Sequence, residues 1–444
     1  MNSDWLAGSG GALHGSIRVP GDKSISHRAV MLAAIAHGQS RVSGFLEGED
    51  TRASARILAQ LGVRIDAPAD GERIVSGVGL HGLAGSDREL DCGNAGTGMR
   101  LFAGLLAGQN FSSRLVGDAS LSARPMGRVI APLTAMGARI DAGPHGRPPL
   151  IVHASNSLQA IDFTTPIPSA QLKSAVLLAG LYAQGTTVVR EAQPTRDYTE
   201  RMLAAFGWPV EFSPGQVRLS GGHCLTATEV AVPADFSSAA FFIVAASIVP
   251  GSDLQLTAVG MNPRRTGLLQ ALRLMGANIV EENPREQGGE IVADLRVRFA
   301  SLRGADIPPA LVPDMIDEFP ALFVAAAVAE GSTRVTGASE LRVKESDRLA
   351  VMTQALVALG ASIQETPDGA IIQGGSLRGG QANSHGDHRI AMSLAVAAQR
   401  ASGEVRILDC ANVATSFPNF PVLAASCGFG LKQAQSVIAV TGPA

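Results

Sequence analysis

Cysteine is scarce in this sequence, with four residues in 444, and no two of them form a Cys-x-x-Cys pair. This argues against a disulfide scaffold and against a zinc ribbon. Aromatic residues make up only 4% of the chain and charged residues 17%, whereas apolar residues reach 46%. That much apolar material argues against a disordered chain and is enough to build a large core.

A long hydrophobic run is also missing. The longest, around residues 239–249, is too short to cross a bilayer, which takes about 20 residues. The N-terminus lacks the basic start and apolar stretch of a signal peptide. The net charge is −3, which argues against a nucleic-acid platform or a basic membrane-surface protein. We therefore expect a cytoplasmic protein with neither nucleic acid nor membrane as a partner.

Glycine, by contrast, is abundant, with 50 residues, and it punctuates a pattern that recurs six times. Each copy has a polar turn, an Ala- and Leu-rich helix, a Gly, a β-like run, a second helix and a second Gly. The copies lie at 26–66, 96–141, 169–211, 236–280, 317–364 and 386–432. The β-like runs, rich in β-branched residues, lie at 41–45, 112–117, 186–191, 253–259, 333–338 and 404–409. The pattern predicts an α/β fold of six units that divides into two domains near 232–236. Each glycine of the pattern stands at a helix end, where we expect it to form a left-handed cap.

The first helix of each unit is apolar beyond its first turn, which predicts a buried helix with a polar start. Capping explains Ser, Thr, Asp and Asn at such starts, but a cation there opposes the helix dipole. Cations nevertheless stand at the starts of first helices (Lys23, Arg28, Arg100, Lys173, Arg389) and of second helices (Arg124, Arg196, Arg264, Arg265, Lys344, Arg348). We infer that these helix starts face one place and bind phosphate or carboxylate groups.

Familiar cofactor motifs are missing from the sequence. There is no GxGxxG for a dinucleotide, and PGDKS lacks the first Gly of a phosphate loop. There is no GxSxG elbow, and neither HExxH nor a Cys/His cluster completes a metal site around His385 and His388. We expect neither a metal nor a cofactor.

Seven segments resemble the EPSP synthase (3-phosphoshikimate 1-carboxyvinyltransferase) family of enolpyruvyl transferases, over about residues 12–432. They are PGDKSISHR (20–28), DCGNAGTGMR (91–100), SARPMGRV (122–129), PSAQLKSAVLLAG (168–180), LRVKESDR (341–348), DHRIAMS (387–393) and ATSFPNF (414–420). The resemblance implies two similar α/β domains, each of three βαβαββ units, with helix N-termini facing an interdomain cleft. In this family the N-terminal strand joins the second domain, which implies domains at 21–236 and at 1–20 with 237–444.

The resemblance also implies a reaction. The carboxyvinyl group of phosphoenolpyruvate passes to the 5-hydroxyl of shikimate 3-phosphate and phosphate is released, a step of the shikimate pathway of aromatic amino acid biosynthesis. Both substrates carry phosphate and one also carries a carboxylate, which agrees with the anions inferred above. Domain closure would exclude water from the cleft. We expect a monomer.

Site residues are carried over position by position from the resemblance. Asp317 would accept the proton of the 5-hydroxyl, Glu345 would protonate the methylene carbon of phosphoenolpyruvate, and Lys23 would touch both substrates. Shikimate 3-phosphate would be bound by Lys23, Ser24, Arg28, Ser169, Gln171, Arg196, Asp317 and Lys344. Phosphoenolpyruvate would be bound by Lys23, Gly96, Arg124, Gln171, Arg348 and Arg389.

Some positions depart from the family pattern. Thr415 stands where members often have Lys, and Glu340 where some have Asn. Arg196 and Lys173 are candidates for phosphate contacts that Tyr or Ser makes elsewhere.

Three alternative functions are open. The sister UDP-N-acetylglucosamine enolpyruvyl transferases have Lys-Asn where this chain has Lys23-Ser24. A non-catalytic phospho-ligand binding protein would need a broken acid–base pair, yet Asp317, Glu345 and Lys23 are all present. An RNA 3′-phosphate cyclase fold is disfavoured by the net charge of −3.

Overall fold

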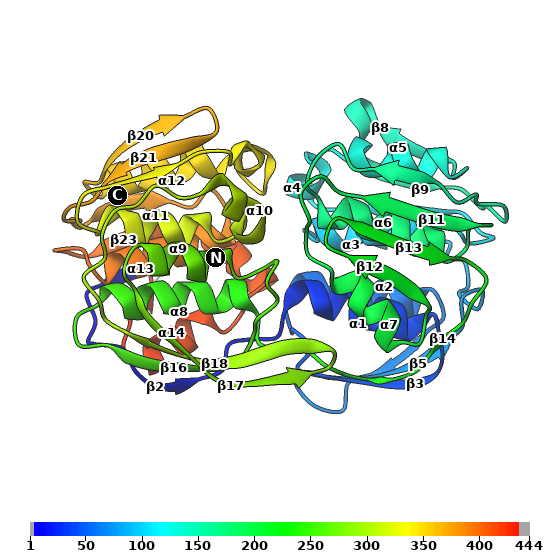
Figure 1. Ribbon diagram of the computed structural model, residues 1–444, viewed down its shortest axis with the longest axis horizontal. Coiled ribbons are helices and arrows are strands. Elements are labelled where there is room, and N and C mark those ends of the chain that lie inside the picture. The colour runs from blue at the N-terminus through cyan, green and yellow to red at the C-terminus, as the bar shows by residue number, and fades with distance from the viewer. Residues whose placement is uncertain (1–3, 435–444) are drawn as a thin grey trace, which may run out of the picture.

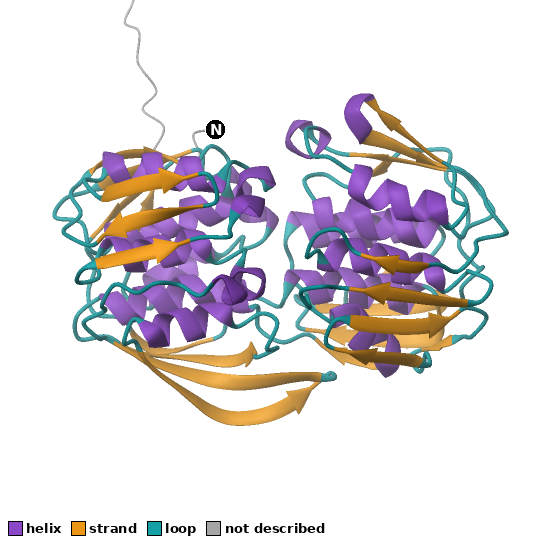
Figure 2. Cartoon of the chain, turned by 45° about the horizontal axis from the view of Figure 1, so that its top comes forward, coloured by secondary structure: helices purple, strands orange, loops and turns teal. Residues whose placement is uncertain are grey.

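Buried helices form the centre of each half of the molecule. The computed structural model describes residues 4–434, in which two halves lie side by side (Figure 1). The central helices are α1 (Lys23–Ala34), α3 (Gly96–Leu106) and α6 (Ala170–Gly180) in one half, and α8 (Phe236–Ile248), α11 (Phe319–Ala327) and α13 (His388–Ala398) in the other. All 13 residues of α8 are buried, as expected for a helix that is apolar on every side. Sheets lie outside these helices (Figure 2).

The first half contains three sheets in the described part of the chain. The first sheet has the strand order β14 (Leu225–Thr226), β3 (Ala36–Ser43), β5 (Glu72–Val78), β4 (Arg64–Asp66), and β15 (Glu229–Ala231) also pairs with β3. The second has the order β6 (Leu90–Asp91), β7 (Ser113–Val116), β9 (Arg147–Val152), β8 (Ile140–Gly143). The third has the order β10 (Asp162–Thr164), β11 (Thr186–Arg190), β13 (Gln216–Ser220), β12 (Val210–Ser213). The other helices are α2 (Glu49–Gln60), α4 (Ala119–Ser122), α5 (Gly127–Ala135) and α7 (Tyr198–Ala205).

The second half repeats this plan within the same described range. One sheet has the strand order β17 (Asn278–Gln287), β18 (Glu290–Arg298), β16 (Asp253–Gly260), β2 (His14–Ile17). Another has the order β19 (Ser332–Val335), β21 (Gly369–Gln373), β20 (Ser362–Thr366). A further sheet has the order β22 (Gly380–Asn383), β23 (Val405–Leu408), β1 (Trp5–Gly8), β24 (Gly430–Gln433). The other helices are α9 (Gly267–Leu274), α10 (Val312–Met315), α12 (Arg348–Ala358) and α14 (Phe420–Ser426).

The predicted repeat is visible in these elements. Each of the six predicted β-like runs overlaps a strand, namely β3, β7, β11, β16, β19 or β23. A glycine with positive φ follows the second helix of every unit, at Gly62, Gly137, Gly207, Gly276, Gly360 and Gly428. Of the glycines after the first helices, Gly108 and Gly403 do not have a positive φ, so the predicted left-handed cap is wrong there. The α/β fold class is confirmed.

The chain crosses between the halves twice, at two adjacent segments. β1 pairs antiparallel with β23 and β24, and β2 pairs parallel with β16, so the N-terminal strands complete sheets of the second half. At the crossings the N–H of Asp235 donates to the carbonyl of Pro20 (2.8 Å) and that of Asp22 to Pro233 (2.9 Å). We propose that the domains are 21–236 and 1–20 with 237–444, of which residues 1–3 and 435–444 lie outside the described part. No helix within residues 4–434 is long and apolar enough to cross a membrane.

Candidate active site

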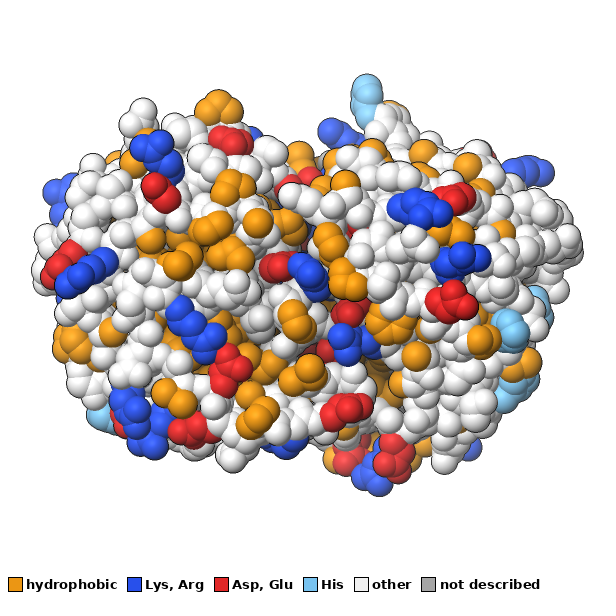
Figure 3. Space-filling model, in the orientation of Figure 1, with side chains coloured by type: hydrophobic (Ala, Val, Ile, Leu, Met, Phe, Trp, Pro, Cys, Tyr) orange, Lys and Arg blue, Asp and Glu red, His pale blue; other side chains and the backbone are white. Residues whose placement is uncertain are grey.

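A cavity of about 370 Å³ lies between the two halves. Residues at the starts of α1, α3, α6 and α13 line it, so the positive ends of buried helices from both halves meet there. Nine Lys or Arg and six Asp or Glu side chains line this cavity, although the whole chain has a net charge of −3. The cavity therefore attracts anions that the rest of the molecule does not. Side chains of both signs are visible along the seam between the halves (Figure 3).

The structure brings the predicted site residues together. Twelve of the thirteen line the cavity: Lys23, Ser24, Arg28, Gly96, Arg124, Ser169, Gln171, Arg196, Asp317, Lys344, Glu345 and Arg389. The thirteenth, Arg348, lies behind the cavity wall with 1% of its side chain exposed. Its guanidinium donates to Glu345 (2.6 Å) and Asp387 (2.8 Å), and Nη1 lies 3.5 Å from Asp317 without a hydrogen-bond partner. Arg348 thus connects the two predicted catalytic carboxylates.

Asp317 is surrounded by cations from both halves. Oδ2 accepts a hydrogen bond from Arg196 of the first half (2.6 Å), and Oδ1 lies 3.6 Å from Nζ of Lys344. Burial by itself would raise the pKa of Asp317, but Lys344, Arg196, Arg389 and Arg265 hold it well below its ordinary value. The carboxylate is therefore ionised and can accept a proton.

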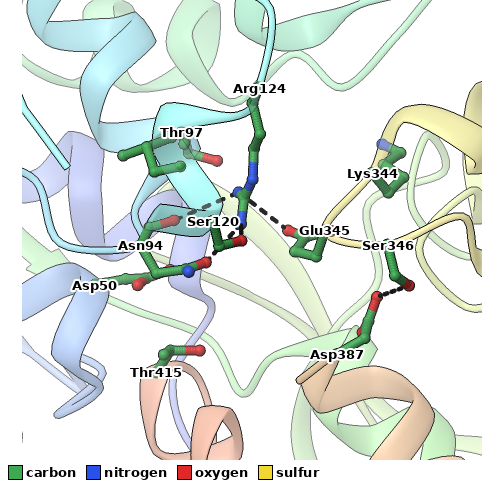
Figure 4. Close-up of polar contacts among 12 residues, drawn as sticks. Asp50, Asn94, Thr97, Ser120, Arg124, Lys344, Glu345, Ser346, Asp387 and Thr415 are labelled. Carbon is green, nitrogen blue, oxygen red and sulfur yellow. Dashed lines mark hydrogen bonds and ion pairs between the residues drawn. The ribbon is translucent and has the colours of Figure 1, made fainter. Parts of the chain in front are cut away.

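Glu345 has a similar environment. Besides its bond from Arg348, its carboxylate lies 3.7 Å from Nη1 of Arg124 in the opposite half (Figure 4). Burial would raise the pKa of Glu345, but Arg348 and Arg124 keep it well below its ordinary value. Arg124 is itself oriented by hydrogen bonds to the side chains of Asn94 (2.6 Å) and Ser120 (3.1 Å). Each carboxylate thus pairs with cations that could bind a substrate.

Gly96, the first residue of α3, allows two arginines to approach the helix start closely. A methyl group added at Gly96 would lie 3.0 Å from Nη1 of Arg124 and 3.1 Å from Nη1 of Arg100. Arg100 donates to Oε1 of Gln171 (2.9 Å), and Nε2 of Gln171 donates to Thr97 (2.8 Å). These contacts fix the amide of Gln171 at the cavity wall.

Two expected anion contacts are wrong. Lys173 does not line the cavity; its buried ammonium forms ion pairs with Glu191 and Glu200, each at 2.8 Å. Its charge is satisfied inside the first half, so no anion is needed there. Arg264 also lies off the cavity, 3.3 Å from Asp314, whereas its neighbour Arg265 lines it.

Thr415, where the family often has Lys, likewise does not line the cavity. Its hydroxyl donates to the carbonyl of Asn412 (2.7 Å).

Several lining residues were not predicted. Asp50 accepts a hydrogen bond from Nζ of Lys23 (2.7 Å), and Arg128 forms an ion pair with Glu340 across the cleft (2.8 Å). Asp50 in the first turn of α2 resembles any acidic residue that favours a helix start, so no sequence signal links it to Lys23. Arg128 and Glu340 are 212 positions apart, and only the folded chain brings them together. Among residues 4–434, no group of three or more His, Cys, Asp and Glu could hold a metal ion.

Two halves of buried helices within sheets thus enclose a cationic cleft that contains two ionised carboxylates. Comparison with known proteins shows that the chain is a transferase of the enolpyruvyl transferase fold. Residues 8–422 match the model of the family EPSP synthase (3-phosphoshikimate 1-carboxyvinyltransferase). The chain belongs to this family.

Individual relatives are similar over nearly their whole length. The 3-phosphoshikimate 1-carboxyvinyltransferase of Xanthomonas euvesicatoria pv. vesicatoria is 67% identical over 97% of this chain and 98% of its own. That of Xanthomonas campestris pv. campestris is 67% identical over 96% and 98%. A solved EPSP synthase structure from Acinetobacter baumannii superposes with a TM-score of 0.88 at 48% identity, covering 98% of this chain and all of that one.

Proposed function

We propose that this protein transfers the carboxyvinyl group of phosphoenolpyruvate to the 5-hydroxyl of shikimate 3-phosphate and releases phosphate. Family membership supports the reaction, and one structural observation supports the roles of the residues: Arg348 contacts both Asp317 and Glu345 at the wall of a cationic cleft. Two ionisable carboxylates held on either side of the reacting atoms suit general acid–base catalysis.

Shikimate 3-phosphate is bound mainly by the first half. Arg28 is fixed by donating to Thr199 (2.8 Å) and Ser174 (2.7 Å), so its orientation is set before the ligand arrives. Arg196 leaves Asp317 to pair with the ligand's anionic group, which frees Oδ2 to receive the proton of the 5-hydroxyl. A prearranged guanidinium loses little entropy on binding phosphate or carboxylate.

Phosphoenolpyruvate is bound between Arg124 of the first half and Arg348 and Arg389 of the second. Its anionic groups compete with Glu345 for Arg124 and Arg348, which are the groups that keep the pKa of Glu345 low. Substrate binding therefore raises this pKa and allows Glu345 to carry a proton to the methylene carbon.

In the addition step, a bond forms between the 5-oxygen and C2 of phosphoenolpyruvate. The hydroxyl proton passes to Asp317, and Glu345 gives its proton to C3. In the elimination step, the bond from C2 to the phosphate oxygen breaks, and Glu345 removes a proton from C3, which restores the double bond. The proton held by Asp317 passes to the departing phosphate, so both carboxylates return to their starting state. Lys23, paired with Asp50, lies where it can neutralise charge on both substrates.

Phosphate release by the purified protein tests this proposal. We expect release only when both substrates are present, and none with UDP-N-acetylglucosamine in place of shikimate 3-phosphate. Asp317→Asn and Glu345→Gln should lower kcat by a factor on the order of 10²–10⁴. Asp162→Asn, in an exposed ion pair with Arg190, serves as the control and should retain activity. Full turnover by Asp317→Asn would refute its role as the base.

We also propose that the enzyme works as a monomer in the cytoplasm. One chain supplies both walls of the cleft, and phosphorylated substrates do not cross a bilayer unaided because transfer of charge into lipid is costly. Light scattering of the active protein measures the first point, and fractionation of cells measures the second.

A further inference from the structure

Arg265 is a buried cation at the cavity for which the reaction described above gives no role. Its side chain is 5% exposed and lies just before α9 in the second half. Nη1 donates to Glu318 (2.8 Å) and lies 3.8 Å from Oδ2 of Asp317. Nη2 donates to Ser237 and lies 3.6 Å from Asp235. One planar group thus contacts the loop before α11 and the first turn of α8.

The partners of Arg265 lie beside the proposed base on one side and at the capped start of α8 on the other. Asp317 is the proposed base, and Glu318 follows it immediately. Asp235 caps α8 at the point where the chain crosses between the halves, and its carboxylate accepts hydrogen bonds from the backbone N–H groups of Ser237 and Ser238. Arg265 therefore anchors the base to the rigid start of a helix whose residues are all buried.

The charge balance around Arg265 depends on its being a cation. Glu318 and Asp317 face it from its own half, Asp235 faces it from the crossing between the halves, and Asp22 and Tyr198 lie near it from the first half. Burial alone would lower the pKa of Arg265, but these acidic neighbours raise it well above its ordinary value. Asp235 and Asp22 also repel one another, because each caps a buried helix at the same crossing.

Arg265 approaches the same oxygen of Asp317 that Arg196 binds. Oδ2 of Asp317 is held by Arg196 from the opposite half, and Arg196 is needed for the substrate. Lys344 and Arg348 approach Oδ1 instead. If Arg196 turns to its ligand, Arg265 still lies 3.8 Å from Oδ2, and Arg389 is bound to the backbone carbonyl of Asp317 (3.1 Å).

We propose that Arg265 is a positioning residue for Asp317: by binding Glu318 and Ser237 with its two arms, it keeps Oδ2 aimed at the 5-hydroxyl after Arg196 has moved. The inference rests on the proposed function. A guanidinium fork can hold two partners in fixed directions, which an ammonium cannot. The neighbouring Arg264 provides a matched control, because its side chain is 36% exposed, lies outside the cavity and donates to Asp314 (3.3 Å) and not to Asp317.

The test compares Arg265→Gln, Arg265→Lys and Arg264→Gln in the assay with both substrates. We expect kcat of Arg265→Gln to fall roughly 10²-fold, because misplacing a reacting group by about 1 Å costs that much. The KM for each substrate should stay within about twofold, because both arms of Arg265 are bound to Glu318 and Ser237. Arg265→Lys should lie in between, and Arg264→Gln should match the wild type. Guanidinium ion at low, non-denaturing concentration should restore part of the kcat of Arg265→Gln.

Three results would each overturn the inference about Arg265. They are an unchanged kcat in a folded Arg265→Gln, a raised KM with unchanged kcat, and no rescue by guanidinium. Binding of shikimate 3-phosphate, followed by calorimetry, shows whether each variant is folded. If Arg265→Gln does not fold, a kcat of Arg265→Lys equal to the wild type would overturn the inference instead. Absence of phosphate release by the wild type would refute the proposed function, which is a separate result.

Discussion

At the residue scale, the position of each cation's partner separates structural cations from functional ones. Lys173 has two carboxylates of its own half around it and is fully enclosed. Arg124 and Arg196 instead pair with Glu345 and Asp317 of the opposite half. Pairs across a cleft can be exchanged for substrate groups when the halves move, whereas a pair inside one core cannot.

This distinction makes a prediction for Lys173→Met. We expect the free energy of unfolding to fall by about 3–5 kcal/mol, because Glu191 and Glu200 would remain buried without a cation. Shikimate 3-phosphate should still bind the folded fraction with wild-type affinity. Urea denaturation and calorimetry measure the two quantities. The control is Arg41→Met in the exposed pair with Glu72, which should hardly change stability. A Lys173→Met protein as stable as the control would contradict the argument.

At the element scale, the hairpin of β17 and β18 connects the two halves. It extends from the second half beneath the first (Figure 1). At its tip Gly288 has φ +59°, and an added methyl there would lie 2.6 Å from the carbonyl of Ala231. Glu290 at the start of β18 accepts a hydrogen bond from Asn262 (3.2 Å), which also donates to Asp197 of the first half (2.7 Å). The hairpin is thus part of the junction between the halves.

Glu290 makes this junction sensitive to pH. Burial raises its pKa to about 7, although Arg201 and Asn262 act in the opposite direction. A carboxyl whose folded pKa is raised stabilises the protein below its unfolded pKa, and this contribution is lost as pH rises through about 7. We therefore expect Glu290→Gln to gain stability relative to the wild type, by up to about 3 kcal/mol, between about pH 5 and about pH 8. Denaturation curves at several pH values provide the measurement, and a constant difference between the two proteins would contradict it.

At the scale of the whole molecule, the two N-terminal strands belong to the second half, although the first half follows them directly in the chain. β1 and β2 leave the N-terminus to join the second half, and β14 and β15 return after α7 to extend the sheet of β3. The two clusters of buried apolar residues follow the same division, because one contains 5–19 with 234–431 and the other 25–232. Only the core of the second half is therefore completed by a segment from outside its main stretch of chain.

Deletion of residues 1–20 tests the proposed domains. β16, β23 and β24 would each lose a neighbouring strand. We expect their amide hydrogens to exchange faster with solvent, because an opened edge lowers the local free energy of unfolding. β7 and β11 of the first half act as internal controls and should stay protected. Equal loss of protection in both halves would argue against domains at 21–236 and at 1–20 with 237–444.

Much of the fold could be predicted from the sequence because its signals are local. Apolar runs, β-branched runs and glycines recur with the period of the unit. They indicate helices, strands and helix ends respectively, and each of these preferences depends on only a few neighbours in the chain. The motifs around Lys23, Arg124 and Glu345 likewise indicated which residues face the cleft. The roles assigned to these residues remain predictions.

The sequence by itself determined six α/β units, their buried helices and the polar and cationic residues at the helix starts. Only the tertiary structure decided which charges meet. Lys173 and Lys23 both stand in the first turn of an apolar helix. The ammonium of Lys173 nevertheless lies between two carboxylates of its own core, whereas that of Lys23 lies at the cleft beside Asp50. Coulomb energies depend on distance and burial, and residues as far apart in the chain as Arg196 and Asp317 acquire both only when the two halves come together.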